Sequence, residues 1–134
     1  MSDSKVDVLK KKVTEQERTI EDYEKLIKSS REQARFLTDV FEASAIGLYV
    51  IDVNNYNIVM ANKAAGFDKL EEGATCHMLT HKSPVPCKGN HLCPLHEVKN
   101  KKKPVITEHI HFDKEGNQIN VEVYGCPIFD KEGM

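Results

Sequence analysis

The chain has 134 residues, which leaves room for about one domain, and a formal net charge of -2 with 30% charged and 40% hydrophobic residues. This balance does not favour a nucleic-acid partner, and the basic run at residues 99–103 is interpreted as a solvated loop or helix end. No apolar run approaches the roughly 20 residues that a membrane span needs, and no apolar signal-peptide core opens the chain. We therefore expect no membrane insertion in this segment and a cytoplasmic location.

Residues 1–44 are predicted to form one long helix of a coiled coil. Neither Gly nor Pro occurs before Ala45, and from Val6 onward a heptad pattern continues in alternating steps of three and four residues. β-Branched residues at the first heptad position favour two parallel helices, so we expect a homodimer through residues 6–41. The alternative is a single amphipathic helix that packs on its own domain. The heptad positions are Val6, Leu9, Val13, Gln16, Ile20, Tyr23, Ile27, Ser30, Ala34, Leu37 and Phe41.

Residues 45–134 are predicted to form an α+β domain. Apolar and alternating runs predict strands at 46–53, 58–61, 105–112 and 118–129. Asn62 is expected to cap a short helix that ends at Gly66, and Pro94 is expected to open another helix. The rest of residues 69–100 is expected to be irregular.

The order of these elements resembles a PAS domain over residues 36–134. The resemblance lies in Phe41 to Gly47 leading into LYVID, in NIVMANKAA, and in the hairpin that ends in CPIFDKEG. It implies a five-stranded antiparallel sheet with short helices over one face, which senses a ligand, cofactor, redox state or partner and passes the change to a flanking coiled coil. Such domains occur in sensor histidine kinases of two-component systems.

The resemblance also predicts that one strand is missing. A PAS sheet has a central fifth strand, whereas this sequence stops after a second Asp-Lys-Glu-Gly turn. We expect a fragment of a longer signalling protein with a downstream signalling domain or partner. The alternative is that another chain supplies the strand.

Four residues in the centre of the domain have metal-ligating side chains. Cys76, His81, Cys87 and Cys93 follow the spacing C-x4-H-x5-C-x5-C, and three thiolates with one imidazole are a common closed zinc set. Zinc is the expected ion. An iron–sulfur cluster would need a fourth thiolate, for which Cys126 is the remaining candidate, and Cys126 is otherwise a small strand residue. The positions of Cys76, His81, Pro86-Cys87 and Cys93-Pro94-Leu95 also resemble a subset of PAS domains from anaerobic microbes.

Other interpretations of these residues stay open. The thiols are also compatible with a redox switch or with reduced buried cysteines. The histidines His77, His91 and His96 could replace His81 as a ligand. His109 and His111 share one face of a strand, where they could face haem or a metal, although exposed strand residues are the more common case.

The expected function is signal sensing with a zinc or redox-cofactor site, relayed through the coiled coil. No nucleophile elbow, phosphate-binding loop or paired carboxylates occur, so no enzyme activity is expected in this segment. The alternative is a zinc-stabilised dimerisation module without a sensing role.

Overall fold

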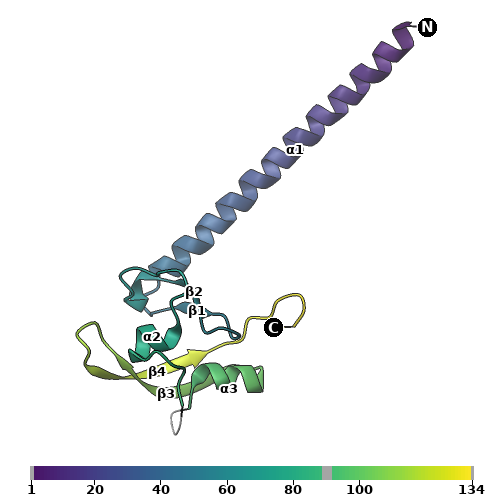
Figure 1. The fold of residues 1–134 in the computed structure, drawn as a ribbon. Coiled ribbons are helices and arrows are strands. Elements are labelled where there is room, and N and C mark those ends of the chain that lie inside the picture. The colour runs from purple at the N-terminus through teal and green to yellow at the C-terminus, as the bar shows by residue number, and fades with distance from the viewer. Residues whose placement is uncertain (1, 89–91, 134) are drawn as a thin grey trace. The chain divides into compact units, whose positions relative to one another are not determined.

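The computed structural model describes residues 2–88 and 92–133, and within them the chain has the predicted α+β class (Figure 1). The chain divides into two compact units, Met1–Ser44 and Ala45–Met134. The first unit is a single long helix, and the second holds short strands and short helices. Within the described residues, no helix is both long and apolar enough to cross a membrane.

Helix α1 spans Ser2–Ala43 without interruption. Its threonines at 14, 19 and 38 bond back to carbonyls four residues earlier, so they leave the helical ladder intact. Apolar heptad side chains are open to solvent, with Val13 50%, Ile20 56% and Ile27 49% exposed. Helix pairing through these residues remains a prediction.

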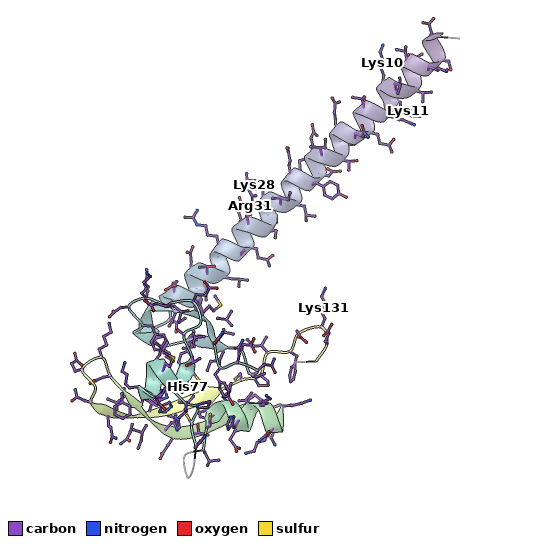
Figure 2. All side chains as sticks on the ribbon, viewed as in Figure 1. Lys10, Lys11, Lys28, Arg31, His77 and Lys131 are labelled. Atoms are coloured by element: carbon purple, nitrogen blue, oxygen red, sulfur yellow. The ribbon has the colours of Figure 1, made fainter. Side chains whose placement is uncertain are left out.

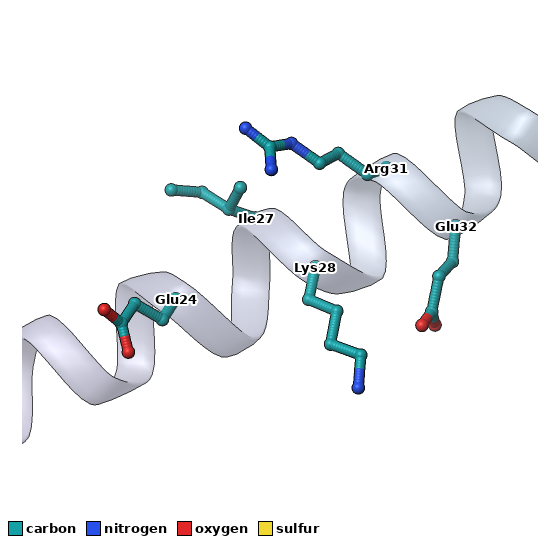
Figure 3. A pocket seen from close by; sticks show the side chains of 5 residues that line it. All are labelled: Glu24, Ile27, Lys28, Arg31 and Glu32. Atoms are coloured by element: carbon teal, nitrogen blue, oxygen red, sulfur yellow. The ribbon is translucent and has the colours of Figure 1, made fainter.

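Charged side chains occur along the whole length of α1. Figure 2 shows Lys10, Lys11, Lys28 and Arg31 projecting outward from the helix. A shallow hollow lies between successive turns of the same helix (Figure 3) and is lined by Glu24, Ile27, Lys28, Arg31 and Glu32. A hollow with walls from one helix has no second element to close it, so it is a surface groove.

The second unit opens with two short antiparallel strands, β1 (Tyr49–Ile51) and β2 (Ile58–Ala61). The first is shorter than the predicted 46–53. Asn62 then caps the short 3-10 helix η1 (Lys63–Ala65), and Gly66 closes it at φ 77°, both as predicted.

Two short helices follow, α2 (Cys76–His81) and α3 (Pro94–Lys101). The start of α3 at Pro94 confirms the prediction. The expectation of an irregular segment before it was wrong for residues 76–81. Thr75 precedes α2 with extended backbone angles, and Lys82 ends it in the left-handed region. The six residues between them form fewer than two turns of helix.

Strands β3 (Val105–Phe112) and β4 (Gln118–Gly125) form an antiparallel hairpin. The bounds of β3 agree with the prediction, but β4 ends four residues before the expected Phe129. Val105 pairs with Gly125 as the last pair. Pro104 and Pro127 flank that end, and because proline has no N–H to donate, the ladder cannot extend there.

In the described part of the chain, the strands form two separate pairs, β1–β2 and β3–β4, and not one continuous sheet. Helix α2 packs on β3, and α3 packs on both β3 and β4. The two helices therefore cover one face of the hairpin, and the candidate site lies where α2 meets β3.

The interior of the second unit is small and unusually polar. The buried apolar residues are Ile58, Ala74, Cys93 and Val98, and the buried polar residues are Asn62, His77, Thr80 and His109. A core of this size supplies little hydrophobic stabilisation, so additional cross-links such as a metal ion would contribute strongly.

Candidate metal centre

Three side chains from three parts of the second unit come together at one point. His81 is the last residue of α2, Cys87 lies in the loop after it, and His109 lies in the middle of β3. Their ligand atoms all lie within 4.8 Å of one another, and the Nε2 atoms of His81 and His109 are 3.1 Å apart. Such a group could hold a metal ion.

Backbone hydrogen bonds fix the start of α2. The N–H of Cys76 donates to the carbonyl of Tyr56, and the N–H of Ile58 donates to the carbonyl of Ala74. These bonds tie the segment before α2 to the start of β2. Because α2 is so short, this anchor also places His81 at its other end.

The end of α2 is held by a second histidine, His77. Its Nδ1 lies 2.9 Å from the carbonyl oxygen of Ser83, so the ring donates there, and it is buried against the ring of Tyr56. Figure 2 shows this side chain among those of the second unit. The contact turns the chain after α2, and that turn leads to Cys87.

Strand alternation brings His109 to the inner face of the hairpin. Its side chain is 5% exposed, so the interpretation of His109 as an exposed strand residue was wrong. His111 is two residues further along β3 and therefore shares this face, where it is half-buried. Helix α2 covers the inner face, because it packs on β3.

The rings of His81, His109 and His111 stand edge-to-face. The centroids of His81 and His109 are 4.7 Å apart, and His111 lies 5.1 Å from His81 and 5.4 Å from His109. Burial and the two neighbouring imidazoles lower the pKa of His111 to about 4, so the ring is neutral at physiological pH. A neutral imidazole keeps a lone pair for a metal ion.

Within this group Cys87 has two thiols for neighbours, those of Cys76 and Cys93, and all three thiols are free. Burial raises the pKa values of Cys76 and Cys87 to about 11, and Cys93 raises both further. Cys87 interacts directly with the thiol of Cys93. Burial, with the three thiols as smaller contributors, raises the pKa of Tyr49 to about 12.

Two of the four predicted ligands belong to this group. The structure brings His81 and Cys87 together with His109, but this group does not include Cys76 or Cys93. Cys76 lies at the other end of α2 from His81, and five residues of helix correspond to a rise of about 7.5 Å. The thiols of Cys76 and Cys93 nevertheless interact with that of Cys87, so they lie next to the group.

The other candidates lie elsewhere. Cys126 follows the end of β4 and is exposed. His77 bonds to Ser83, and His96 lies 3.2 Å from the hydroxyl of Tyr56. His91 lies outside the described residues.

His109 is the ligand candidate that the spacing of the Cys/His segment did not reveal. It lies 28 residues after His81, and only the packing of α2 on β3 brings the two together. The signal in the sequence was the pair His109 and His111 at alternate positions of a strand. Alternation places both on one face, but it does not say which element covers that face.

The donor set indicates a class of metal. Imidazole suits zinc, copper, iron and nickel, and a thiolate favours zinc or Cu(I) among them. The group of His81, Cys87 and His109 could therefore hold a metal ion that accepts nitrogen and sulfur ligands together.

Comparison with known proteins found no family model, no curated protein and no solved structure that matches this chain.

Proposed function

We propose that this chain is a metal-binding sensory module of a signalling protein, with a PAS-type domain and a zinc-type site formed by His81, Cys87 and His109. The observation that carries the proposal is the convergence of these three ligand atoms within 4.8 Å. They come from a helix, a loop and a strand, so an ion at this point would connect the α2 segment to the hairpin.

The PAS part of the proposal rests on the resemblance in the sequence, and the observed elements are compatible with it. A PAS sheet joins its outer strand pairs through a central fifth strand, and this chain forms two antiparallel pairs with short helices on the hairpin face. The proposed site lies beside that hairpin. A change in metal occupancy or thiol oxidation would alter the contact between α2 and β3, which is the sensing step of the proposal.

The long helix supports the relay part of the proposal. Its apolar heptad residues are exposed in the single chain, and a second helix would cover them. We propose a cytoplasmic homodimer through residues 6–41 that passes the state of the domain to a downstream signalling domain or partner. The segment itself acts without catalysis.

A second candidate function is a zinc-stabilised dimerisation module. The small and polar core of the second unit favours this candidate. A metal cross-link would contribute much of the stability of such a unit. In this case the ion has a structural task only, and its occupancy does not change with a stimulus.

Zinc titration of the full chain under reducing conditions tests the metal site. We expect one equivalent to bind, and we expect Cys87→Ser and His109→Ala to weaken binding on the order of ten-fold or more. Cys126→Ser serves as the control, because this exposed thiol lies outside the group. Equal zinc binding by the wild type and both site variants would contradict the proposal.

Measurement of the helix pairing with and without zinc separates the two candidate functions. Spin labels at two exposed positions of α1 report the distance between the paired helices. A change of that distance on zinc removal, with the domain still folded, supports sensing. Unfolding of the domain with an unchanged helix pair favours the structural role.

A further inference from the structure

The group of His81, Cys87 and His109 supplies three ligands, whereas zinc in closed protein sites takes four. The candidates for the fourth position are His111, the neighbouring thiols and water. The arrangement of the three imidazole rings distinguishes between them.

The rings of His81, His109 and His111 form a nearly equilateral triangle. Their centroids are 4.7, 5.1 and 5.4 Å apart, and their planes cross at 78°, 89° and 82°. Each ring thus stands nearly perpendicular to the other two, so every pair of rings meets edge-to-face.

This triangle has the dimensions of three imidazoles on a tetrahedral ion. Zn–N bonds of about 2.0–2.1 Å at tetrahedral angles place the ligand nitrogens about 3.4 Å apart and the ring centres about 5 Å apart. The Nε2 atoms of His81 and His109 are 3.1 Å apart, close to that value. Hence little movement of these two rings is needed to admit an ion.

We propose that His111 is the fourth ligand, so that the ion is held by three imidazoles, from His81, His109 and His111, and by one thiolate, from Cys87. The inference rests on the proposed metal site and specifies its ligands. The ring of His111 already lies beside the other two, but its nitrogens lie outside the group of atoms within 4.8 Å. A half-turn about χ2 exchanges the ring nitrogens with ring carbons and leaves the backbone of β3 in place.

The thiols of Cys76 and Cys93 have a different role in this arrangement. Cys93 interacts with Cys87 from the start of α3, where its carbonyl accepts from the N–H of Glu97. Its thiol therefore lies beside the proposed ligand Cys87 without being one of the four ligands, in the position that groups around metal ligands commonly take.

X-ray absorption at the zinc edge of the full chain, loaded with one equivalent of zinc, tests this ligand set. One sulfur and three imidazoles around zinc support the proposal. Two or more sulfurs, or only two imidazoles, overturn it, and both results leave the proposed metal site intact. Failure of the wild type to bind zinc overturns the site and the ligand set together.

The variant His111→Ala provides an independent test, with His96→Ala as the matched control. We expect His111→Ala to remove one imidazole from the zinc spectrum and to weaken zinc binding on the order of ten-fold or more. His96 bonds to Tyr56, so its replacement should leave the spectrum unchanged. An unchanged spectrum in folded His111→Ala contradicts the role of His111, and if that variant does not fold, the wild-type spectrum decides.

Discussion

Single side chains hold much of the second unit together, and Asn62 is the clearest case. It is 3% exposed, its Oδ1 accepts from the N–H groups of Leu48 and Ala65, and its Nδ2 donates to the carbonyl of Ile46. One amide therefore joins the chain before β1 to the start of η1. Its loss would leave buried backbone groups without partners, which is costly in a unit with so small a core.

Replacement of this residue, Asn62→Ala, is expected to lower the free energy of unfolding by about 2 kcal/mol or more, because it removes three hydrogen bonds, one of which caps η1. Urea denaturation followed by circular dichroism measures the change. The control is Asn120→Ala on the exposed side of β4, which should change stability little. A loss in Asn62→Ala no larger than in the control would contradict this account.

The thiol of Cys87 is expected to make the zinc affinity of the proposed site depend on pH. Because its pKa is about 11, the thiol is protonated at pH 7, and zinc must displace that proton. The apparent zinc affinity should therefore rise with pH between about 7 and 9, by up to about ten-fold per unit for this one proton. Competition with a chelator of known pH dependence measures it, and an affinity that falls over this range would show that Cys87 is not a ligand.

At the scale of elements, close backbone contacts set the position of α3 over the hairpin. A Cβ at Gly125 would lie 2.8 Å from Cγ2 of Val98 and 3.3 Å from Cγ2 of Val105. Val98 is one of the few buried apolar residues, and its side chain is stiff because it is branched at Cβ. The absence of a side chain at Gly125 thus allows α3 to approach the end of the hairpin.

For this reason Gly125→Ala is expected to destabilise the second unit by about 1–3 kcal/mol through overpacking. Thermal unfolding of the single and double variants with Val98→Ala measures the coupling. The double variant should lose less stability than the sum of the two singles, since Val98→Ala removes the clashing methyl groups. Strict additivity would show that the two sites do not meet.

At the scale of the whole molecule, the chain combines two units with different needs. The helix α1 exposes large apolar side chains along its length, whereas the second unit buries few. An isolated helix gains stability mainly through packing of its apolar face. Pairing with a second helix would bury this apolar face and stabilise α1, with no contribution from the core of the second unit.

The variant Ile27→Lys places a charge at the centre of the heptad pattern, and we expect it to convert a dimer into a monomer. Sedimentation of the full chain measures the change. The control is Val8→Lys, which makes the same kind of substitution at an exposed position outside the heptad series. A dimer that survives Ile27→Lys, or a wild-type monomer, would argue against pairing through residues 6–41.

The sequence by itself determined the elements whose signals are local. Helix α1 contains no glycine or proline, and η1 lies between Asn62 and Gly66. Helix α3 begins at Pro94, and β3 has the bounds that its sequence predicts. Each of these follows from interactions within a few residues of the chain, so no knowledge of packing is needed. The ends of the first and last strands were less accurate, because strand bounds depend on the partner that each residue meets.

Only the tertiary structure decided which of the metal-ligating residues come together. Spacing along the chain grouped His81 and Cys87 with Cys76 and Cys93, but the packing of α2 on β3 places His109 beside them. The formation of α2 places Cys76 and His81 at opposite ends of a short helix. A ligand set depends on distances through space, and these are set by how helix and strand pack rather than by their order in the chain.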